Sequence, residues 1–175
     1  TTEEMIKGMK ASGFDSLRVP VAWTNAMEYE KGDYTINEAY LDRVEEVINY
    51  ALDNDMYVII NDHWDGSWWG MFGSSKQSDV DKAFEMYKSM WTQIANRYKK
   101  YSDRLIFEGA NEELGDRLND TDVCKNSGSL SKAECYEMAN KINQTFVDTV
   151  RATGGNNEQR FLLIAGYNTD ITMTC

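Results

Sequence analysis

The chain has little of the residue types on which metal sites depend. It contains one histidine and one proline among 175 residues, and its three cysteines, Cys124, Cys135 and Cys175, show neither CxxC spacing nor a neighbouring histidine. Because zinc sites are built from clustered cysteine and histidine, we expect no metal and no other cofactor. Cys124 and Cys135 fit a disulfide or two free thiols equally well, and the sequence leaves both open.

Positive charge is also scarce, with 18 basic against 29 acidic residues and a formal net charge of -11. Such a surface repels phosphate backbones and anionic lipids, so neither nucleic acid nor a membrane is an expected partner. The apolar runs are much shorter than the roughly 20 residues that cross a bilayer. No signal peptide is recognised at the N-terminus. We therefore expect a soluble chain of one domain or part of one.

Apolar residues alternate between helical and strand spacing along the chain. Helices are predicted over residues 1–12, 40–51, 84–95 and 138–150, and strands over residues 14–21, 57–60, 105–107 and 161–165. Continuous apolar runs such as Tyr57-Val58-Ile59-Ile60 are typical of buried parallel strands. Helices that alternate with strands predict an α/β fold with a parallel sheet and right-handed crossovers.

A glycine-rich turn after the first strand is missing. Residues 14–21 lead into Ala22-Trp23-Thr24, and the next glycine is Gly32. Nucleotide-binding doubly wound sheets need such a turn, so a barrel is favoured over a doubly wound sheet. Active sites of barrels collect at the carboxyl ends of the strands. Reactive or polar residues stand near all four of these predicted ends: Arg18, His63, Asn111-Glu112 and Tyr167-Asn168.

Asn111-Glu112 is the pair most suggestive of chemistry. A carboxylic acid at the end of a buried strand is a candidate acid/base, although most Asn-Glu pairs mark a turn or the start of a helix. Glu108 lies inside the same strand, and a buried carboxylate without a partner is unfavourable. We therefore predict that Arg18 contacts Glu108, directly or through Asn111. Arg18 then either keeps a catalytic carboxylate ionised or forms a structural ion pair, or both.

His63 and the tryptophans are candidates for contact with a substrate. A lone histidine is more often a structural hydrogen-bonding residue than a ligand, but His63 could donate to a substrate hydroxyl or a carboxylate. Trp64, Trp68 and Trp69 follow in the next loop, and Trp23 occupies the corresponding place one strand earlier. They form either a hydrophobic cap over the barrel or a platform on which sugar rings stack.

Four segments in this order carry a resemblance to a known family: GFDSLRVPVAW, YVIINDHWD, LIFEGANEEL and LLIAGYNTD. Together they resemble glycoside hydrolase family 5, and most closely its endo-β-1,4-glucanases. The resemblance implies a TIM barrel that cleaves β-glycosidic bonds with retention of configuration. It implies that Glu112 is the general acid/base, that Asn111 is its partner, and that Arg18 and His63 belong to the same site. Substrate contacts are expected from Trp23, Trp64, Trp68, Trp69, Tyr167 and Asn168.

The same resemblance implies that the chain is the N-terminal half of the catalytic domain, residues 1–175. It would hold barrel strands two to five with four helices, without strand one and the C-terminal half. The family's nucleophilic glutamate lies on strand seven, and no segment here matches it. Asp62, Asp65, Glu113 and Asp170 could lie near the rim, but none fits that role. Two departures from the family pattern are Trp64, where a second histidine is usual, and Glu113, where a proline is usual.

The resulting expectation is a retaining endo-β-1,4-glucanase of plant polysaccharides, secreted, whose chain is inactive without a nucleophile. Its partners would be a β-glucan and either the missing half of the barrel or a second copy joined edge to edge. The alternative is a non-catalytic carbohydrate-binding module on the same scaffold, which would keep the tryptophan loop but have no need of Glu112 or Arg18.

Overall fold

The structure is a computed structural model that describes residues 1–63, 65–122 and 124–173. Trp64 and Cys175, both singled out in the sequence, lie outside these residues. The described part contains a sheet of four strands, β1 (Ser16–Val19), β2 (Tyr57–Asn61), β3 (Leu105–Glu108) and β4 (Leu162–Leu163). The strands alternate with the helices α1 (Glu3–Ala11), α2 (Glu38–Leu52), α3 (Gln77–Tyr98) and α4 (Lys132–Ala152).

All pairings in this sheet are parallel, in the order β1-β2-β3-β4. The expected partial barrel of four parallel strands and four helices is therefore confirmed. The first and last strands are shorter than predicted. β1 stops at Val19 because Pro20 has no N–H to donate to a neighbouring strand. β4 pairs only through Leu162 and Leu163, since it has one neighbour and lies at the edge.

All four predicted helices are present, but α3 and α4 begin at Gln77 and Lys132, before the predicted residues 84 and 138. Several of the helix ends carry capping residues. The Thr2 hydroxyl caps α1, and Asn37 caps α2. Ser131 and Glu134 form a reciprocal capping box at the start of α4. Gly13 and Gly154, at φ of 93° and 72°, follow the ends of α1 and α4 in the left-handed region that favours glycine. No helix of the described part is long and apolar enough to cross a membrane.

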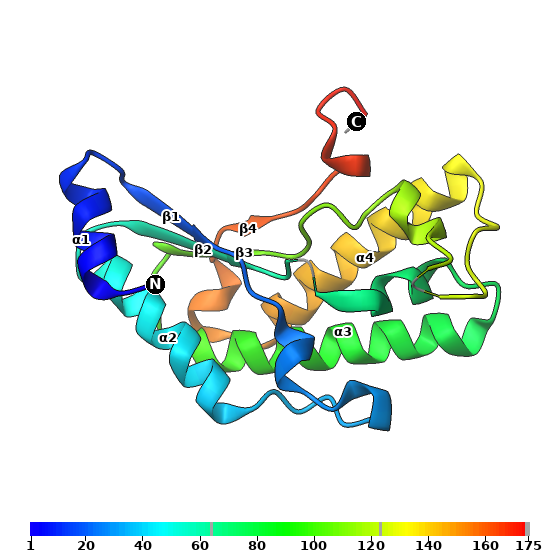
Figure 1. The fold of residues 1–175 in the computed structure, drawn as a ribbon, viewed down its shortest axis with the longest axis horizontal. Helices are drawn as coiled ribbons and strands as arrows, with labels where there is room; N and C mark the ends of the chain where they lie inside the picture. The colour runs from blue at the N-terminus through cyan, green and yellow to red at the C-terminus, as the bar shows by residue number, and fades with distance from the viewer. Residues whose placement is uncertain (64, 123, 174–175) are drawn as a thin grey trace.

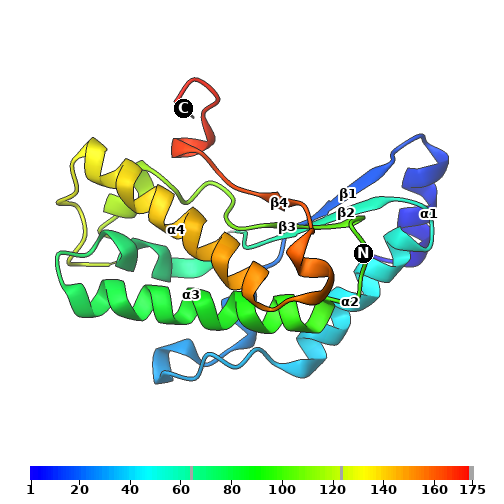
Figure 2. The ribbon, with the colours of Figure 1, turned by 180° about the vertical axis from the view of Figure 1, so that it is seen from behind.

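Helices α2, α3 and α4 cover one face of the sheet, and none of the described α-helices lies on the opposite face (Figures 1 and 2). The core lies between these two layers. The strands turn Val58, Ile60, Leu105 and Phe107 toward it, all 0% exposed. From α3 and α4, Trp91 and Phe146 pack against each other with ring centroids 4.6 Å apart. Arg18 and Glu108 belong to the other face, since they alternate with these buried positions.

The helix-free face is partly apolar and open. Tyr57, Phe161 and Leu163 are 46%, 58% and 42% exposed. Within the described residues, β1 and β4 each pair with one strand only, so each leaves an edge with free backbone groups. The segment after β4 rises on this open side of the sheet (Figure 1). A concave apolar face with two free edges is the geometry of an incomplete barrel.

Candidate active site

Arg18, Glu108 and Asn111 meet on the helix-free face of the sheet. Arg18 Nε and Nη2 donate to the two carboxylate oxygens of Glu108, each at 2.7 Å, and Nη2 also donates to Asn111 Oδ1 at 2.7 Å. The predicted contact is confirmed and is direct, and Arg18 binds Asn111 in addition. The Glu108 side chain is 15% exposed and that of Arg18 is 38% exposed. The arginine therefore offsets a largely buried carboxylate and still reaches the surface.

The charge of Arg18 acts beyond this pair. Its hydrogen bond to Glu108 raises the pKa of the guanidinium above the ordinary value, and the charges of Glu108, Glu113 and Glu112 act in the same direction. A field is mutual, so the Glu112 carboxylate lies in the positive potential of Arg18.

Glu112 follows Asn111 in the loop that leaves β3 and is exposed to solvent. The residues on either side of it are held in place. Asn111 is 9% exposed, and its N–H donates to Glu113 Oε2 at 2.7 Å. Glu113 is itself buried at 5% exposure. An exposed carboxyl on a fixed backbone at the carboxyl end of a strand is available to a ligand on the open face.

His63 is held by the ends of β1 and β2. Its N–H donates to the Val21 carbonyl at 2.9 Å, and its Nδ1 lies 3.0 Å from Asn61 Nδ2. Asn61 Oδ1 accepts from the Val21 N–H at 3.4 Å, so the Asn61 amide group is the donor to His63 Nδ1. In the neutral ring the proton then resides on Nε2. His63 can donate from that atom, as the sequence suggested.

The tryptophans are placed differently from the expected sugar platform. Trp23, Trp68 and Trp69 are 0%, 1% and 3% exposed. Trp68 and Trp69 stack on each other at 4.6 Å between centroids and pack against Phe72 and Tyr87. A ring with no open face cannot stack on a sugar, so the platform prediction is wrong for these three in this structure. They form the hydrophobic cap that was the other possibility.

Tyr167 and Asn168 also lie at a strand end, but their side chains are engaged within the chain. Tyr167 is 3% exposed, stacks on Tyr136 and donates to Asp116 Oδ1 at 2.5 Å. Asn168 donates to Asp116 Oδ2 at 2.8 Å, and its Oδ1 accepts from the Asp116 N–H at 2.9 Å. Substrate contact by Tyr167 and Asn168 stays a prediction. Both residues clamp the segment after β4 to the loop after β3.

Sequence reasoning gave little weight to three acids beneath the rim. Asp62, Asp65 and Glu113 are 0%, 1% and 5% exposed. Burial and the neighbouring charge of Asp65 raise the pKa of Asp62 well above its ordinary value. The sequence signal for these three acids is their position, because each stands within five residues of a strand end. Whether such a residue faces solvent or the core is set by other loops.

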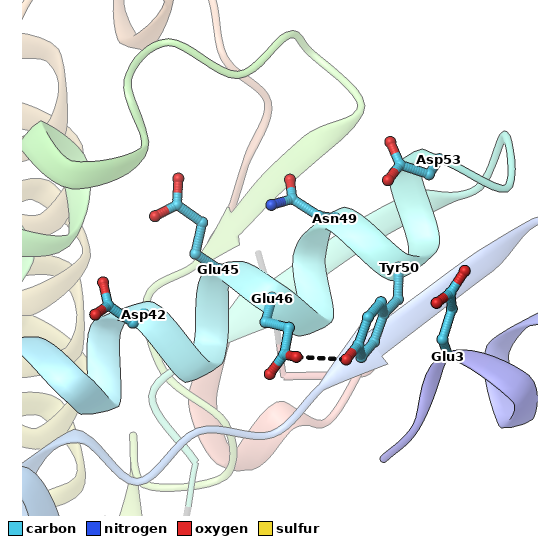
Figure 3. A pocket seen from close by; sticks show the side chains of 7 residues that line it. All are labelled: Glu3, Asp42, Glu45, Glu46, Asn49, Tyr50 and Asp53. Atoms are coloured by element: carbon cyan, nitrogen blue, oxygen red, sulfur yellow. Dashed lines mark hydrogen bonds between the residues drawn. The ribbon is translucent and has the colours of Figure 1, made fainter.

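Two hollows in the structure have different characters. One, of about 370 Å³, is lined by Glu108, Asn111 and the segment 163–171, beside the arginine network. The other, drawn in Figure 3, lies along α2 next to Glu3 of α1, and most of its lining residues are acidic. Arg97 on α3 binds two of those acids, Asp42 and Glu45, at 2.5 and 2.6 Å. These ion pairs join α2 to α3, so the second hollow is a structural feature of the helix layer.

The spacing of Cys124 and Cys135 left open whether they form a disulfide or stay free thiols. Cys124 and Cys135 are both free thiols in the structure. Cys135 is buried and accepts a hydrogen bond from Asn119 Nδ2 at 3.6 Å. No disulfide therefore constrains the loop between the two cysteines.

Known proteins resemble the chain over its whole length. The family model of cellulase (glycosyl hydrolase family 5) matches residues 1–175. A xyloglucan-specific endo-β-1,4-glucanase of Bacteroides ovatus is 41% identical over 167 residues, 95% of this chain and 31% of the relative. Endoglucanase A of Ruminococcus albus is 41% identical over 167 residues, covering 95% of this chain and 43% of the relative. The chain thus spans less than half the length of these relatives.

Solved structures agree with this result. A broad-specificity endoglucanase from Ruminococcus champanellensis with bound cellotriose superposes with a TM-score of 0.78 at 40% identity, over 95% of this chain and 45% of that one. A lichenase from Caldicellulosiruptor sp. F32 gives a TM-score of 0.78 at 41% identity, over 95% and 43%. The four parallel strands therefore correspond to about half of such a barrel.

Proposed function

The chain belongs to glycosyl hydrolase family 5, and on that premise we propose that it is part of a retaining endo-β-1,4-glucanase in which Glu112 is the general acid/base. The observation that carries the proposal is the contact of Arg18 with both Glu108 and Asn111, directly before Glu112. It gathers a fixed amide, a guanidinium and an exposed carboxyl at the carboxyl ends of neighbouring strands, where barrel enzymes act.

Each group has a role in this mechanism. Glu112 protonates the oxygen of the leaving sugar, and afterwards removes a proton from water. Asn111, whose Oδ1 is engaged by Arg18, presents its Nδ2 group toward a sugar hydroxyl. His63 donates from Nε2 to another hydroxyl. Arg18 holds Asn111, the residue directly before Glu112, through its hydrogen bond to Oδ1.

The second carboxyl of the mechanism is proposed to lie outside this chain. Retaining hydrolysis needs two carboxyl groups about 5 to 5.5 Å apart. Glu108 is bound on both oxygens by Arg18, so it does not supply a free nucleophile. We infer that residues 1–175 form the N-terminal half of the catalytic domain, with barrel strands two to five, and that the nucleophile belongs to the other half.

The open face and its edges support the same proposal. Phe161, Leu163 and Ile164 are 58%, 42% and 59% exposed beside the free edge of β4. We propose that the remaining strands of the barrel cover them. A second copy joined edge to edge is the other possible occupant, and sedimentation of the purified chain distinguishes them. A stable, well-folded monomer at micromolar concentration would contradict both.

The substrate class follows from the relatives. Their names specify xyloglucan and lichenan, and cellotriose is bound in one of the structures. We propose a β-glucan of plant origin as the substrate. A plant polysaccharide is encountered outside the cell, so we also propose that the protein is secreted. The alternative, a carbohydrate-binding module, is disfavoured because three of the tryptophans that would carry it are buried.

The experiment is hydrolysis of carboxymethylcellulose and lichenan by the chain and by the full-length polypeptide that contains it. We expect activity only in the full-length polypeptide, and a loss of about 10³-fold on Glu112→Gln. Strong activity from residues 1–175 alone, abolished by Glu112→Gln, would refute the need for the other half. Full activity of the Gln variant would refute the role of Glu112.

A further inference from the structure

Three buried acids beneath the candidate site have no role in the mechanism above. Asp62 and Asp65 belong to the loop after β2, and Glu113 belongs to the loop after β3. All three are at most 5% exposed. Within the described residues, no group of three or more acids, cysteines or histidines is arranged to hold a metal ion. A buried charge is costly unless hydrogen bonds or protonation compensate it.

Asp65 is compensated by the loop that follows β1. Its Oδ1 accepts from the Thr24 N–H at 2.8 Å and from the Thr24 hydroxyl at 2.7 Å, and its Oδ2 accepts from the same N–H at 3.1 Å. These bonds join the loops that follow β1 and β2.

Glu113 is bound within its own loop. Its Oε2 accepts the Asn111 N–H at 2.7 Å and thereby closes a short ring around Glu112. The Asn111 side chain is held from the other side by Arg18. Two hydrogen bonds of Asn111, from its N–H to Glu113 and from Arg18 to its side chain, thus fix the backbone that leads into Glu112. The family usually has a proline here, whose ring restricts the backbone; in this chain a hydrogen bond does so.

Asp62 has no hydrogen bond of comparable geometry in the described part of the chain, although the side chains of Asp65 and Trp69 lie near enough to act on its pKa, the first raising it and the second lowering it. Both of its oxygens are buried without a hydrogen-bond partner there. The titratable groups that act on it or feel its charge are Asp65, Glu113, Tyr40 and Tyr87, and each of these is an acid. Burial and the charge of Asp65 raise the pKa of Asp62. A buried carboxyl in such surroundings keeps its proton.

We propose that Glu113 is a positioning residue for Asn111 and Glu112, and that Asp62 carries a proton so that Glu113 keeps its negative charge nearby. The inference rests on the proposed function, since Glu112 is the acid/base only there. Ionisation of Asp62 would add a third buried negative charge to those of Glu113 and Asp65. The loops after β2 and β3 would then separate, and Glu112 would lose its fixed direction.

The experiment uses the full-length polypeptide and the variants Glu113→Ala, Glu113→Gln and Asp62→Asn. The first removes the acceptor for the Asn111 N–H, the second keeps an acceptor oxygen, and the third keeps a neutral side chain of the same size. The exposed Glu137 on α4 supplies the control, Glu137→Ala. The measurements are kcat and KM on lichenan from pH 5 to 8, and the amide resonance of Asn111 in protein labelled with ¹⁵N-asparagine.

For Glu113→Ala we expect kcat to fall between about tenfold and a hundredfold with KM within about twofold, and the Asn111 resonance to move. Glu113→Gln should stay within about threefold of the unmodified enzyme. Asp62→Asn should match the unmodified enzyme at pH 5, where Asp62 carries its proton, and its kcat should be no lower than that of the unmodified enzyme at any higher pH, because asparagine cannot ionise. The Glu137 control should change nothing.

An unchanged Asn111 resonance and unchanged kcat in Glu113→Ala would overturn the proposal. If that variant does not fold, a tenfold loss of kcat in Glu113→Gln would overturn it, because the hydrogen-bond acceptor is still present. The Asn111 amide resonance can be measured in a protein that has no activity. An inactive full-length protein in which the resonance still moves as expected would refute the proposed function while the positioning of Asn111 stands.

Discussion

Arg18 on β1 and Glu108 on β3 are joined across β2 by two parallel hydrogen bonds of 2.7 Å, although they lie 90 residues apart in the chain. The register of the paired strands explains how Arg18 reaches Glu108. Arg18 is aligned with Ile59, and Asn61, two residues further on the same side of β2, is aligned with Glu108. The long Arg18 side chain therefore crosses β2 and extends only two residues along the strand direction. The pair fixes the spacing of three strand ends, at which Asn111 and His63 also lie.

Arg18→Lys should separate catalysis from stability. A lysine has no planar fork, so it cannot bind Glu108 and Asn111 together. We expect kcat/KM of the full-length enzyme on lichenan to fall by about 10²-fold. The free energy of unfolding should change by less than about 1 kcal/mol, since the Arg18 side chain is 38% exposed. Arg104→Lys, in an exposed ion pair with Asp55, is the control, and equal activity of both variants would contradict the prediction.

Asp62→Asn should stabilise the protein at neutral pH. The folded-state pKa of Asp62 is raised above its ordinary value of 3.8, so the folded protein binds more protons than the unfolded chain above that pH. The free energy of unfolding then falls as pH rises from about 4. Asparagine cannot ionise, so the variant avoids this loss. Urea denaturation should show a gain on the order of 1 kcal/mol or more at pH 7 that disappears toward pH 4. A gain independent of pH would contradict the assignment.

Arg160→Met should be strongly destabilising. This side chain is 1% exposed, and its guanidinium donates to the carbonyls of Leu105 at 2.6 Å and Tyr101 at 2.7 Å. Burial lowers its pKa to about 10, so it is still charged at neutral pH. Removing it leaves buried carbonyls without donors, at a cost of about 3 kcal/mol or more. Urea denaturation measures this, with the exposed Arg104→Met as control, and equal effects would show that burial of Arg160 is not the cause.

Gly115→Ala should loosen the clamp between the loop after β3 and the segment after β4. Gly115 has φ of +125°, and a Cβ there would lie 2.1 Å from Asn168 Oδ1. Because that oxygen accepts the Asp116 N–H, we expect a loss of about 2 kcal/mol in the free energy of unfolding. Gly8→Ala in α1 is the matched control, since nothing lies within 4 Å of its added Cβ. That control should be neutral or gain up to about 1 kcal/mol. Protection of the Asn168 amide from hydrogen exchange reports the clamp directly.

The helices and strands could be predicted because their signals are local. Residues such as Thr2, Ser131 and Gly13 mark helix ends by their own hydrogen bonds and dihedral angles. The Arg18–Glu108 contact was also predictable, because a carboxylate inside a strand requires a nearby positive charge. The strand limits were less certain: β4 has one neighbour, and its extent depends on pairing rather than on its own composition.

The candidate site was only partly predictable. Glu112 and His63 stand at strand ends that the sequence indicated, and their roles stay predictions. The aromatic residues were misjudged. Trp68 and Trp69 follow a strand end as a sugar platform would, yet they are buried against Phe72 and Tyr87. A tryptophan has the same identity in a core and in a binding cleft, and only its neighbours distinguish them.

By itself the sequence determined the alternation of helix and strand, the parallel sheet and the need for a partner to Glu108, because periodicity and charge act at short range or leave few choices. Only the tertiary structure decided which loop residues are buried: that Trp23 is core, that Glu113 holds Asn111, and that Asp62 lies near two other acids. The physical reason is that a loop side chain is buried by residues from other elements, and the packing of those elements is not encoded at the position itself.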